Sequence, residues 1–250
     1  MINKKELIEF TDKYSLGGII EKARWIVDDE NHTIFVGSTS ENSNIDVEVV
    51  LKDNFNIQSL SVVFASTLTL KRMLNVLSDD IKSIEPKFRG DFVTKLTFDD
   101  GLSTISCIGY DKAIIKEYIP IKHTGDKVLS IKLKEEFISR YLKVKSAMTG
   151  QESFKIVNID GKIILSIGYS DRNTDRININ IETEIDNIPE DYPISFNAEY
   201  LKQILTNNNG EAILDIYCKD GDKYIGIIRY STDLFECKYI LYQRIENDEI

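Results

Sequence analysis

Apolar residues along this chain recur with two spacings, one typical of helices and one typical of strands. Leu133, Phe137, Tyr141, Val144 and Met148 follow one another at intervals of four, four, three and four residues, so they lie on one face of a helix. Lysine and arginine residues lie away from the centre of that face. Similar spacing predicts four helices in all, at residues 4–14, 67–77, 133–148 and 197–206.

Short runs rich in Val, Ile, Thr, Tyr and Phe lie between these helices and predict β-strands separated by polar turns. In the first half the predicted strands are 19–27, 33–38, 45–51, 61–64, 92–98, 103–108 and 113–119. In the second half they are 127–131, 154–159, 162–169, 176–182, 193–196, 211–219, 223–230 and 235–244. The turns Asp99-Asp100-Gly101 and Asp160-Gly161 each predict a hairpin, because aspartate followed by glycine favours a tight turn.

The four predicted helices recur at regular intervals. Leu7, Leu70, Ile138 and Leu201 each begin a similar short apolar pattern, and they are separated by 63, 68 and 63 residues. The repeated offset predicts an internal duplication of a unit with one helix and several strands. In the second half this unit reads strand, helix and three strands, and it is used twice. Two such units form one domain, with both helices on one side of a sheet surface.

Residues 120–127 (PIKHTGDK) interrupt the pattern with a proline, a glycine and mixed charge. Such a composition between two strand-like segments is typical of a connector between domains. We therefore expect an N-terminal domain at 1–119, a connector at 120–127 and a C-terminal domain at 128–250. The predicted fold class is α+β, with all four helices on the same side of the two-domain chain.

Charge is distributed unevenly along the chain. The formal net charge of −10 argues against a protein covered by nucleic acid on all sides. Lysines and arginines nevertheless gather on or just before the predicted helices. These candidate DNA-facing residues are Lys4, Lys5, Lys13, Lys71, Arg72, Lys132, Lys134, Arg140, Lys143, Lys145 and Lys202. A basic helical surface on an acidic chain suits contact with duplex DNA through its phosphates, without sequence readout, while an ordinary solvated surface is the alternative interpretation.

Motifs of catalysis and metal binding are absent from the sequence. It contains no Walker P-loop, GxGxxG, HExxH or GxSxG motif. Its three cysteines form no CxxC pair, and His32 and His123 stand alone, so we expect no metal, no cofactor and no enzyme activity. We find no signal-peptide pattern and no apolar run long enough to span a membrane, and we expect a cytoplasmic protein with reduced cysteines.

Several stretches of the chain resemble DNA sliding clamps. They are Val62–Asp80 in the first half and Val128–Phe137, Lys155–Ser166 and Pro193–Gln243 in the second. The last of them is similar to the closing unit of clamps, which consists of a helix, a hairpin and a final edge strand. The resemblance is strongest to the clamps of T-even-type bacteriophages and extends more distantly to eukaryotic and archaeal PCNA. It covers nearly the whole chain in architecture, but in sequence it is carried by the part after Val128.

The resemblance implies a closed homotrimeric ring with the helices lining a central hole and the sheets outside. Edge strands near 113–119 and at 176–182 would pair between subunits. The ring would encircle duplex DNA and tether the replicative DNA polymerase, and an ATP-dependent clamp loader would open it. It would have no catalytic residue and no cofactor of its own.

The resemblance also implies an apolar pocket near the connector, where partner proteins dock short peptides. The residues implicated by position are Pro120, Ile121, His123, Tyr242 and Ile245. Two other functions stay open, namely a processivity factor that keeps this fold without closing a ring and a viral structural oligomer of the same sheet architecture. An acidic small-molecule enzyme is a more distant alternative.

Overall fold

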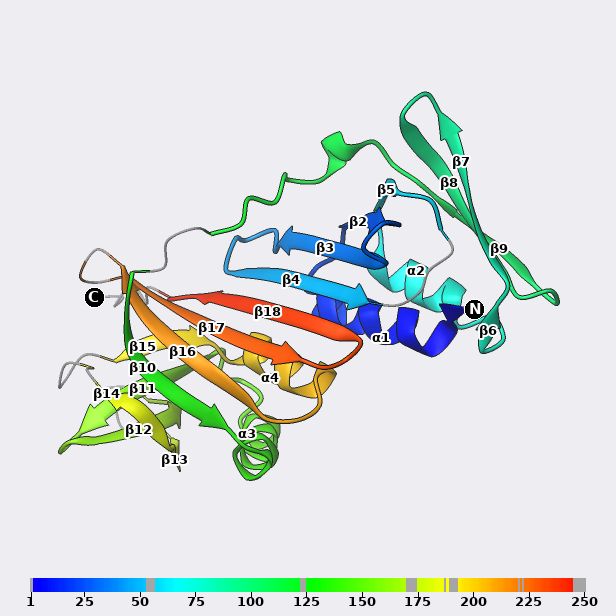
Figure 1. Ribbon diagram of the computed structural model, residues 1–250. Coiled ribbons are helices and arrows are strands. Elements are labelled where there is room, and N and C mark those ends of the chain that lie inside the picture. Colours follow the sequence, from blue (N-terminus) through cyan, green and yellow to red (C-terminus); the bar gives the residue numbers. More distant parts are fainter. Residues whose placement is uncertain are drawn as a thin grey trace. The chain divides into compact units, whose positions relative to one another are not determined.

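The computed structural model describes residues 2–52, 57–121, 125–169, 175–186, 188, 193–219, 221 and 223–244 (Figure 1). The chain folds into two compact units. The N-terminal unit comprises the described parts of 1–41, 46–120 and 231–237, and the C-terminal unit those of 42–45, 121–230 and 238–250. The principal boundary between them lies between Pro120 and Ile121.

The N-terminal unit combines two helices with antiparallel sheets. Its helices are α1 (Lys4–Ser15) and α2 (Thr67–Leu74). Its strands are β1 (Ile2–Asn3), β2 (Ala23–Asp28), β3 (Thr33–Thr39), β4 (Ile45–Lys52), β5 (Leu60–Phe64), β6 (Asp80–Ile81), β7 (Ser83–Arg89), β8 (Phe92–Asp99) and β9 (Thr104–Ile108). Strands β4, β3, β2 and β5 are neighbours in that order, β7, β8 and β9 form a second sheet, and β1 pairs with β6.

Both helices of this unit begin at side-chain caps that can be read from the sequence. The Asn3 Oδ1 atom accepts a hydrogen bond from the backbone amide two residues later at 2.9 Å, and the Ser66 Oγ atom accepts one from the amide three residues later at 3.2 Å. Helix α1 matches its prediction closely. Helix α2 ends at Leu74, before the predicted end at Leu77, although Leu77 is still buried.

An aromatic cluster joins α1 to β2 and β5. Trp25 packs edge-on against Phe10 and Phe64, with ring centroids 5.6 and 5.1 Å apart. Its indole Nε1 atom donates a hydrogen bond to the Tyr14 hydroxyl at 3.0 Å. Trp25 and Tyr14 are almost completely buried, so this cluster forms the centre of the core of the N-terminal unit.

Two strands of this unit differ from the sequence prediction. The strand predicted at 19–27 starts only at Ala23, because Gly17 and Gly18 adopt positive φ angles in a 3₁₀ turn at Leu16–Gly18. Strand β7 is missing from the sequence prediction, because Pro86 in its middle argues against a strand. The proline is tolerated because β7 is an edge strand of its sheet.

The strand predicted at 113–119 is also wrong. The Asp111 side chain accepts a hydrogen bond from the Ala113 amide at 2.8 Å and starts a short 3₁₀ turn at Lys112–Ile114. Residues 115–120 then run without regular structure, and Ile119 is exposed. The sheet formed by β7, β8 and β9 therefore ends at β9, whose last residue is Ile108.

Tyr118 fixes this irregular segment to the unit's own sheet. The Tyr118 hydroxyl donates a hydrogen bond to the Glu48 Oε1 atom at 2.6 Å. Its ring lies directly over Gly37 of β3, where any Cβ atom would clash with it. The absence of a side chain at Gly37 therefore makes room for the anchor.

Replacing Gly37 by alanine is expected to displace the Tyr118 ring and loosen residues 115–121, because the methyl group overfills the site at a cost of about 1–3 kcal/mol. Hydrogen exchange of the 115–121 backbone should become faster, while that of β2 stays unchanged. Gly150→Ala is the matched control, because a Cβ atom there meets nothing within 4 Å. Equal exchange in both variants would contradict the anchoring role.

The C-terminal unit also combines two helices with antiparallel sheets. Its helices are α3 (Glu135–Ala147) and α4 (Ala198–Asn207). Its strands are β10 (Asp126–Leu133), β11 (Ser153–Ile159), β12 (Lys162–Ile167), β13 (Ile177–Asn180), β14 (Thr183–Asp186), β15 (Ile194–Asn197), β16 (Ala212–Lys219), β17 (Lys223–Ser231) and β18 (Phe235–Tyr242), whose last residues belong to this unit. Strands β14, β10, β16 and β17 are neighbours in that order, and β13, β12, β11 and β15 form a second sheet.

The start of α3 differs from its prediction. Leu133 is the last residue of β10 and is buried there, so the helix begins at Glu135. Tyr141 is fully buried, and its hydroxyl donates a hydrogen bond to the Ala198 carbonyl oxygen at 2.9 Å, which connects α3 to the first residue of α4. Burial raises the pKa of the Tyr141 hydroxyl well above its ordinary value. Strand β14 was not predicted.

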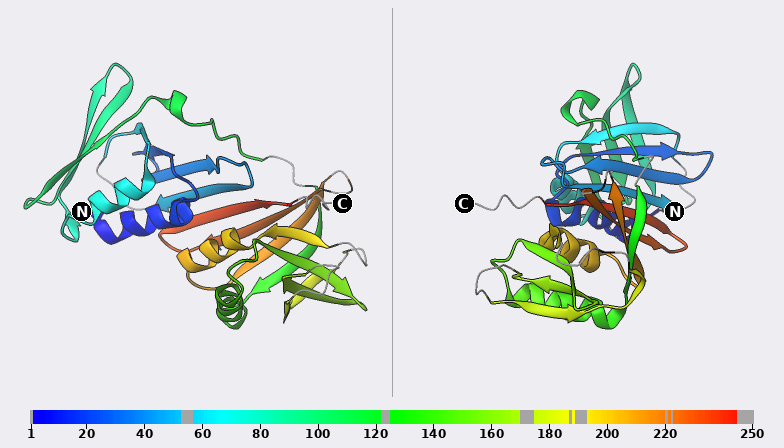
Figure 2. Two further views of the ribbon diagram at one scale, coloured as in Figure 1. Left: turned by 180° about the vertical axis from the view of Figure 1, so that it is seen from behind. Right: turned by 90° about the vertical axis from the view of Figure 1, so that its left-hand side faces the viewer.

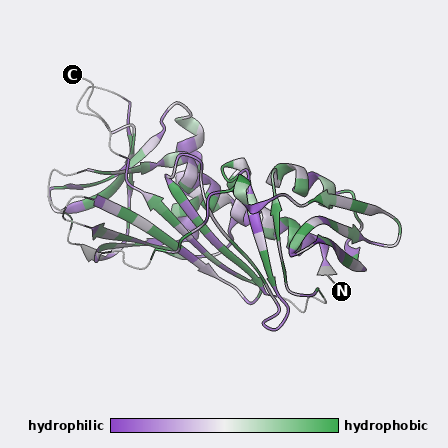
Figure 3. Ribbon diagram, turned by 90° about the horizontal axis from the view of Figure 1, so that it is seen from above, coloured by the Kyte–Doolittle hydropathy of each residue, from purple (hydrophilic) through white to green (hydrophobic). Residues whose placement is uncertain are grey.

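Within each unit the two helices are packed against each other, α1 against α2 and α3 against α4 (Figure 2). Hydrophobic and hydrophilic residues alternate along the strands, as the period-two pattern predicts (Figure 3). In the described part of the chain, no helix is long and apolar enough to cross a membrane.

Candidate nucleic-acid interface

The first two candidate cations lie in the first turn of α1. Lys4 and Lys5 form ion pairs with the two carboxylate oxygens of Asp79, at 3.2 and 2.9 Å. Lys4 also donates to the Leu77 carbonyl oxygen at 2.6 Å. Hydrogen bonds from Lys5 and then Lys4 lower the pKa of the Asp79 carboxyl group.

The next cations lie on the adjoining faces of α1 and α2. Lys71 of α2 pairs with Asp12 of α1 at 2.5 Å. Lys13 is only 4% exposed, because it pairs with Glu9 at 3.1 Å and lies over the Phe235 ring. Arg72 is exposed, and no described carboxylate lies within ion-pair distance of it. Lys13 was predicted to face outward, and its burial removes it from the cations that can reach a phosphate.

Three cations around the start of α3 are paired with glutamates. Lys132 pairs with Glu184 at 2.9 Å, Lys134 with Glu182 at 2.7 Å and Arg140 with Glu136 at 3.3 Å. The hydrogen bond between Lys134 and Glu182 raises the pKa of the lysine and lowers the pKa of the glutamate. All six side chains are partly or largely exposed, so solvent screens these pairs.

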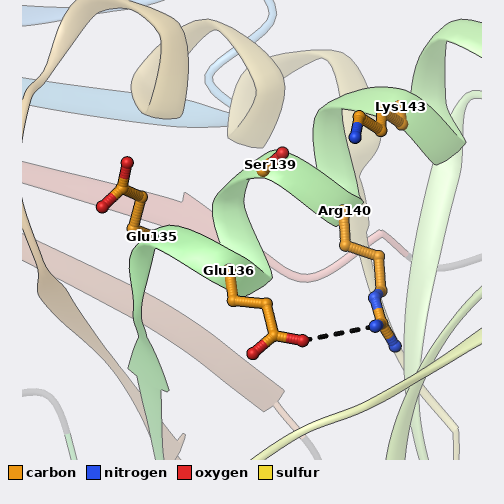
Figure 4. A pocket seen from close by; sticks show the side chains of 5 residues that line it. All are labelled: Glu135, Glu136, Ser139, Arg140 and Lys143. Carbon is orange, nitrogen blue, oxygen red and sulfur yellow. Dashed lines mark hydrogen bonds and ion pairs between the residues drawn. The ribbon is translucent and has the colours of Figure 1, made fainter.

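A pocket of about 450 Å³ lies on the exposed side of α3. Its lining residues are Glu135, Glu136, Ser139, Arg140 and Lys143 (Figure 4). Arg140 forms an ion pair with Glu136, which lies one turn earlier on the same helix. Lys143 has no carboxylate within ion-pair distance among the described residues. Lys143 is therefore the cation of α3 that is most available to an anionic ligand.

The last two candidates converge on one glutamate of α4. Glu199 pairs with Lys202 at 3.0 Å and with Lys145 at 3.8 Å. Partial burial alone would raise the pKa of the Glu199 carboxyl group, but hydrogen bonds from Gln203 and Lys202 hold it below its ordinary value. Lys145 is only 6% exposed, so it lies on the packed face of α3 instead of the predicted outer face.

The structure thus separates the predicted cations into three groups. Arg72 and Lys143 are exposed and unpaired within the described chain, and Lys13 and Lys145 are buried. Each of the remaining candidates forms an ion pair with a carboxylate. Sequence reasoning missed most of these acidic partners, because they come from other elements. Glu9 and Glu136 lie at the helical i, i+4 spacing from their cations, and Glu199 lies at i, i+3 from Lys202.

The residues predicted to form a partner pocket are only partly covered by the structure. His123 and Ile245 lie outside the described residues, and Pro120 is exposed. Ile121 and Tyr242 are brought together, because both pack against one apolar cluster on the C-terminal unit. The buried members of this cluster are Ile225, Ile227 and Ile240, and Tyr217 is its third partly buried neighbour.

Tyr217 was not predicted to belong to this group. It faces Ile225 across the β16–β17 pairing, and the next residue on the same face of β16 is Asp215. The Asp215 carboxylate accepts a hydrogen bond from the Ser130 hydroxyl at 2.6 Å and pairs with Lys127 at 3.1 Å. The apolar cluster therefore has a charged border, which is a common arrangement for a peptide-binding surface.

The described residues offer no cluster of side chains suited to a metal ion. They contain no group of three or more His, Cys, Asp or Glu residues that could hold a metal ion. The cysteines Cys107, Cys218 and Cys237 form no disulfide with one another; Cys107 and Cys237 are buried and Cys218 is partly exposed.

Comparison with known proteins places this arrangement in a structural context. No protein-family model matches the sequence. No curated protein sequence matches it either. Among solved structures, the chain is similar to one described as the C-terminal region of FEN-1 bound to A. fulgidus PCNA, with 14% sequence identity and a TM-score of 0.67 over 99% of this chain and 98% of that chain. The chain therefore has a PCNA-like clamp fold.

Proposed function

We propose that this protein is a sliding clamp, a non-catalytic ring that encircles duplex DNA and tethers the replicative DNA polymerase. The observation that carries the proposal is the PCNA-like fold, which extends over 99% of the chain. The helices of this acidic chain also carry the candidate cations, which suits a protein that meets DNA over one surface only. In this proposal the chain contributes no catalytic residue and no cofactor, and an ATP-dependent clamp loader supplies the energy for opening the ring.

The proposed ring is a homotrimer closed by strand pairing between copies. Strands β9 and β13 each end a sheet, and each carries an exposed isoleucine, Ile108 or Ile177. An open strand edge with an apolar side chain is suited to pairing with another chain. The opposite edge of the β9 sheet is β7, where a proline and charged residues discourage such pairing.

Contact with DNA would be made through phosphates alone. Arg72 and Lys143 present their charges to solvent, and the paired lysines around them are held only by screened ion pairs. Such contacts carry no base readout, and they can be exchanged from one phosphate to the next. A ring that holds DNA in this way can slide along the duplex.

Partner proteins would dock at the apolar cluster that includes Ile121, Tyr217 and Tyr242. Partly buried aromatic side chains with a charged border provide both apolar area and hydrogen-bonding groups for a short peptide. We propose that the DNA polymerase and the clamp loader use this surface in turn.

Reversing the charge of the two unpaired cations is expected to impair processive synthesis. The double variant Arg72→Glu and Lys143→Glu should shorten the products made on a primed circular template with the cognate polymerase and loader, because two phosphate contacts become repulsive. Circular dichroism should remain unchanged, since both side chains are exposed.

The control is Lys87→Glu together with Lys162→Glu. Both lysines are exposed on strands, and the change in net charge is the same. Product lengths that fall equally in both double variants would show a general effect of charge. Unchanged lengths in the helix variant would argue against DNA contact at α2 and α3.

A further inference from the structure

Acidic side chains accompany the cations of the proposed DNA-facing surface much more regularly than cations elsewhere. Within the described residues, the cations on or next to the helices pair with Asp12, Asp79, Glu9, Glu136, Glu182, Glu184 or Glu199, and only Arg72 and Lys143 lack a carboxylate. Away from the helices, Lys87, Arg89, Lys95 and Lys162 have no carboxylate within ion-pair distance in the described chain. Other cations there do pair, namely Lys22 with Glu41, Lys52 with Glu236, Lys127 and Arg229 with Asp215, and Arg244 with Glu152. Pairing is therefore more frequent near the helices than elsewhere in the described chain, without being confined to them.

Apart from Glu184, which pairs with Lys132 on strand β10, these carboxylates fall into two groups. Glu9 and Glu199 pair with the buried cations Lys13 and Lys145, and Glu199 also accepts a hydrogen bond from Gln203 at 2.8 Å, so both glutamates serve the packing of the helices. Asp79 holds the first turn of α1 through two lysines. These three have an evident structural role.

Glu136 and Glu182 have no comparable packing role, and Asp12 joins one lysine across α1 and α2 while both side chains stay partly exposed. Glu136 and Glu182 are 85% and 64% exposed, and each meets one cation that is itself about half exposed. Asp12 is 28% exposed and meets Lys71 between α1 and α2. In each pair the carboxylate occupies the position beside the cation that a phosphate oxygen would need.

We infer that Asp12, Glu136 and Glu182 act as internal competitors of the DNA backbone and weaken the grip of this surface on phosphate. A cation that already holds a carboxylate has to lose that pair before it can bind a phosphate, or it must bring the two anions together. The inference rests on the proposed function and adds a regulatory property to the same surface. Weak phosphate contacts allow a ring to move along DNA, since its retention comes from encirclement.

The test is the triple variant Asp12→Asn, Glu136→Gln and Glu182→Gln, in which each amide nearly preserves the shape of the side chain. Binding to a short linear duplex is measured by fluorescence anisotropy over a range of salt concentrations. We expect each neutralised carboxylate to raise the affinity by about twofold to fivefold, because one exposed ion pair no longer competes. The single variant Glu136→Gln, at an 85% exposed position, provides the same readout if the triple variant folds poorly.

The control is the triple variant Glu30→Gln, Glu85→Gln and Asp233→Asn, which changes the net charge equally at exposed positions on strands and turns. Tighter binding by the first triple variant alone supports the inference. Unchanged binding, or an equal increase in both triple variants, overturns it. If Arg72→Glu with Lys143→Glu also leaves binding unchanged, the failure belongs to the proposed function, whereas a loss of binding in that variant confines the failure to the role of the carboxylates.

Discussion

Replacing Ile108 or Ile177 by lysine is expected to leave the protein monomeric at micromolar concentration. Ile108 ends β9 and is 62% exposed, and Ile177 begins β13 and is 36% exposed. In the proposed trimer these strands pair between copies, and a lysine there places an uncompensated charge at an otherwise apolar contact. Sedimentation equilibrium should give three times the chain mass of 28.7 kDa for the unmodified protein and a single chain mass for either variant.

Ile159→Lys serves as the control, because Ile159 is 37% exposed but lies at the end of β11, which is not an edge strand. It should remain trimeric. A monomeric unmodified protein would contradict the ring and favour a processivity factor that keeps this fold without closing. A trimer that survives both edge substitutions would place the interface on other strands.

Replacing Trp25 by alanine should destabilise the N-terminal unit by about 3–5 kcal/mol. The side chain is 1% exposed and packs between Phe10 and Phe64, so its removal leaves a cavity at the centre of the aromatic cluster. It also deprives the buried Tyr14 hydroxyl of its indole donor. Denaturant unfolding followed by far-UV circular dichroism is the appropriate measurement. Trp25 is the sole tryptophan of the chain, so the variant has no tryptophan fluorescence to follow.

Trp25→Phe separates the two contributions to this effect. Phenylalanine keeps an aromatic ring between Phe10 and Phe64 but cannot donate to Tyr14, so it should destabilise the unit by clearly less than alanine does. An alanine variant that unfolds at the same denaturant concentration as the unmodified protein would show that this cluster is not the centre of the core.

The helices were the part of the fold most accurately predicted from sequence. Helix α1 has its cap at Asn3 and its apolar face at Leu7, Phe10 and Tyr14 within one short segment, so local information is sufficient. The predictions failed where a contact between distant residues decided the backbone. Residues 113–119 have a strand-like pattern, but Tyr118 packs over Gly37 of a different strand, and no local pattern reveals that contact.

The candidate site shows the same division at the level of side chains. Its lysines and arginines could be named from the sequence, because their spacing places them near helices. Whether each cation is available to a phosphate could not be predicted, because that depends on partners that lie on different helices. Asp12 is such a partner for Lys71, and Glu199 is one for Lys145. The strand β9 was predicted at 103–108, but its edge position was missed, since a strand becomes an edge only through what its neighbours pair with.

By itself, then, the sequence determined four amphipathic helices between runs of strands, an acidic chain with its cations near those helices, and a resemblance to sliding clamps. Periodicity, capping and charge act over a few residues, so they can be read directly. The tertiary structure alone decided which strands end their sheets, that Lys13 and Lys145 are buried, and that Arg72 and Lys143 remain exposed. Burial and ion pairing depend on residues that are distant in sequence and become neighbours only when the chain folds.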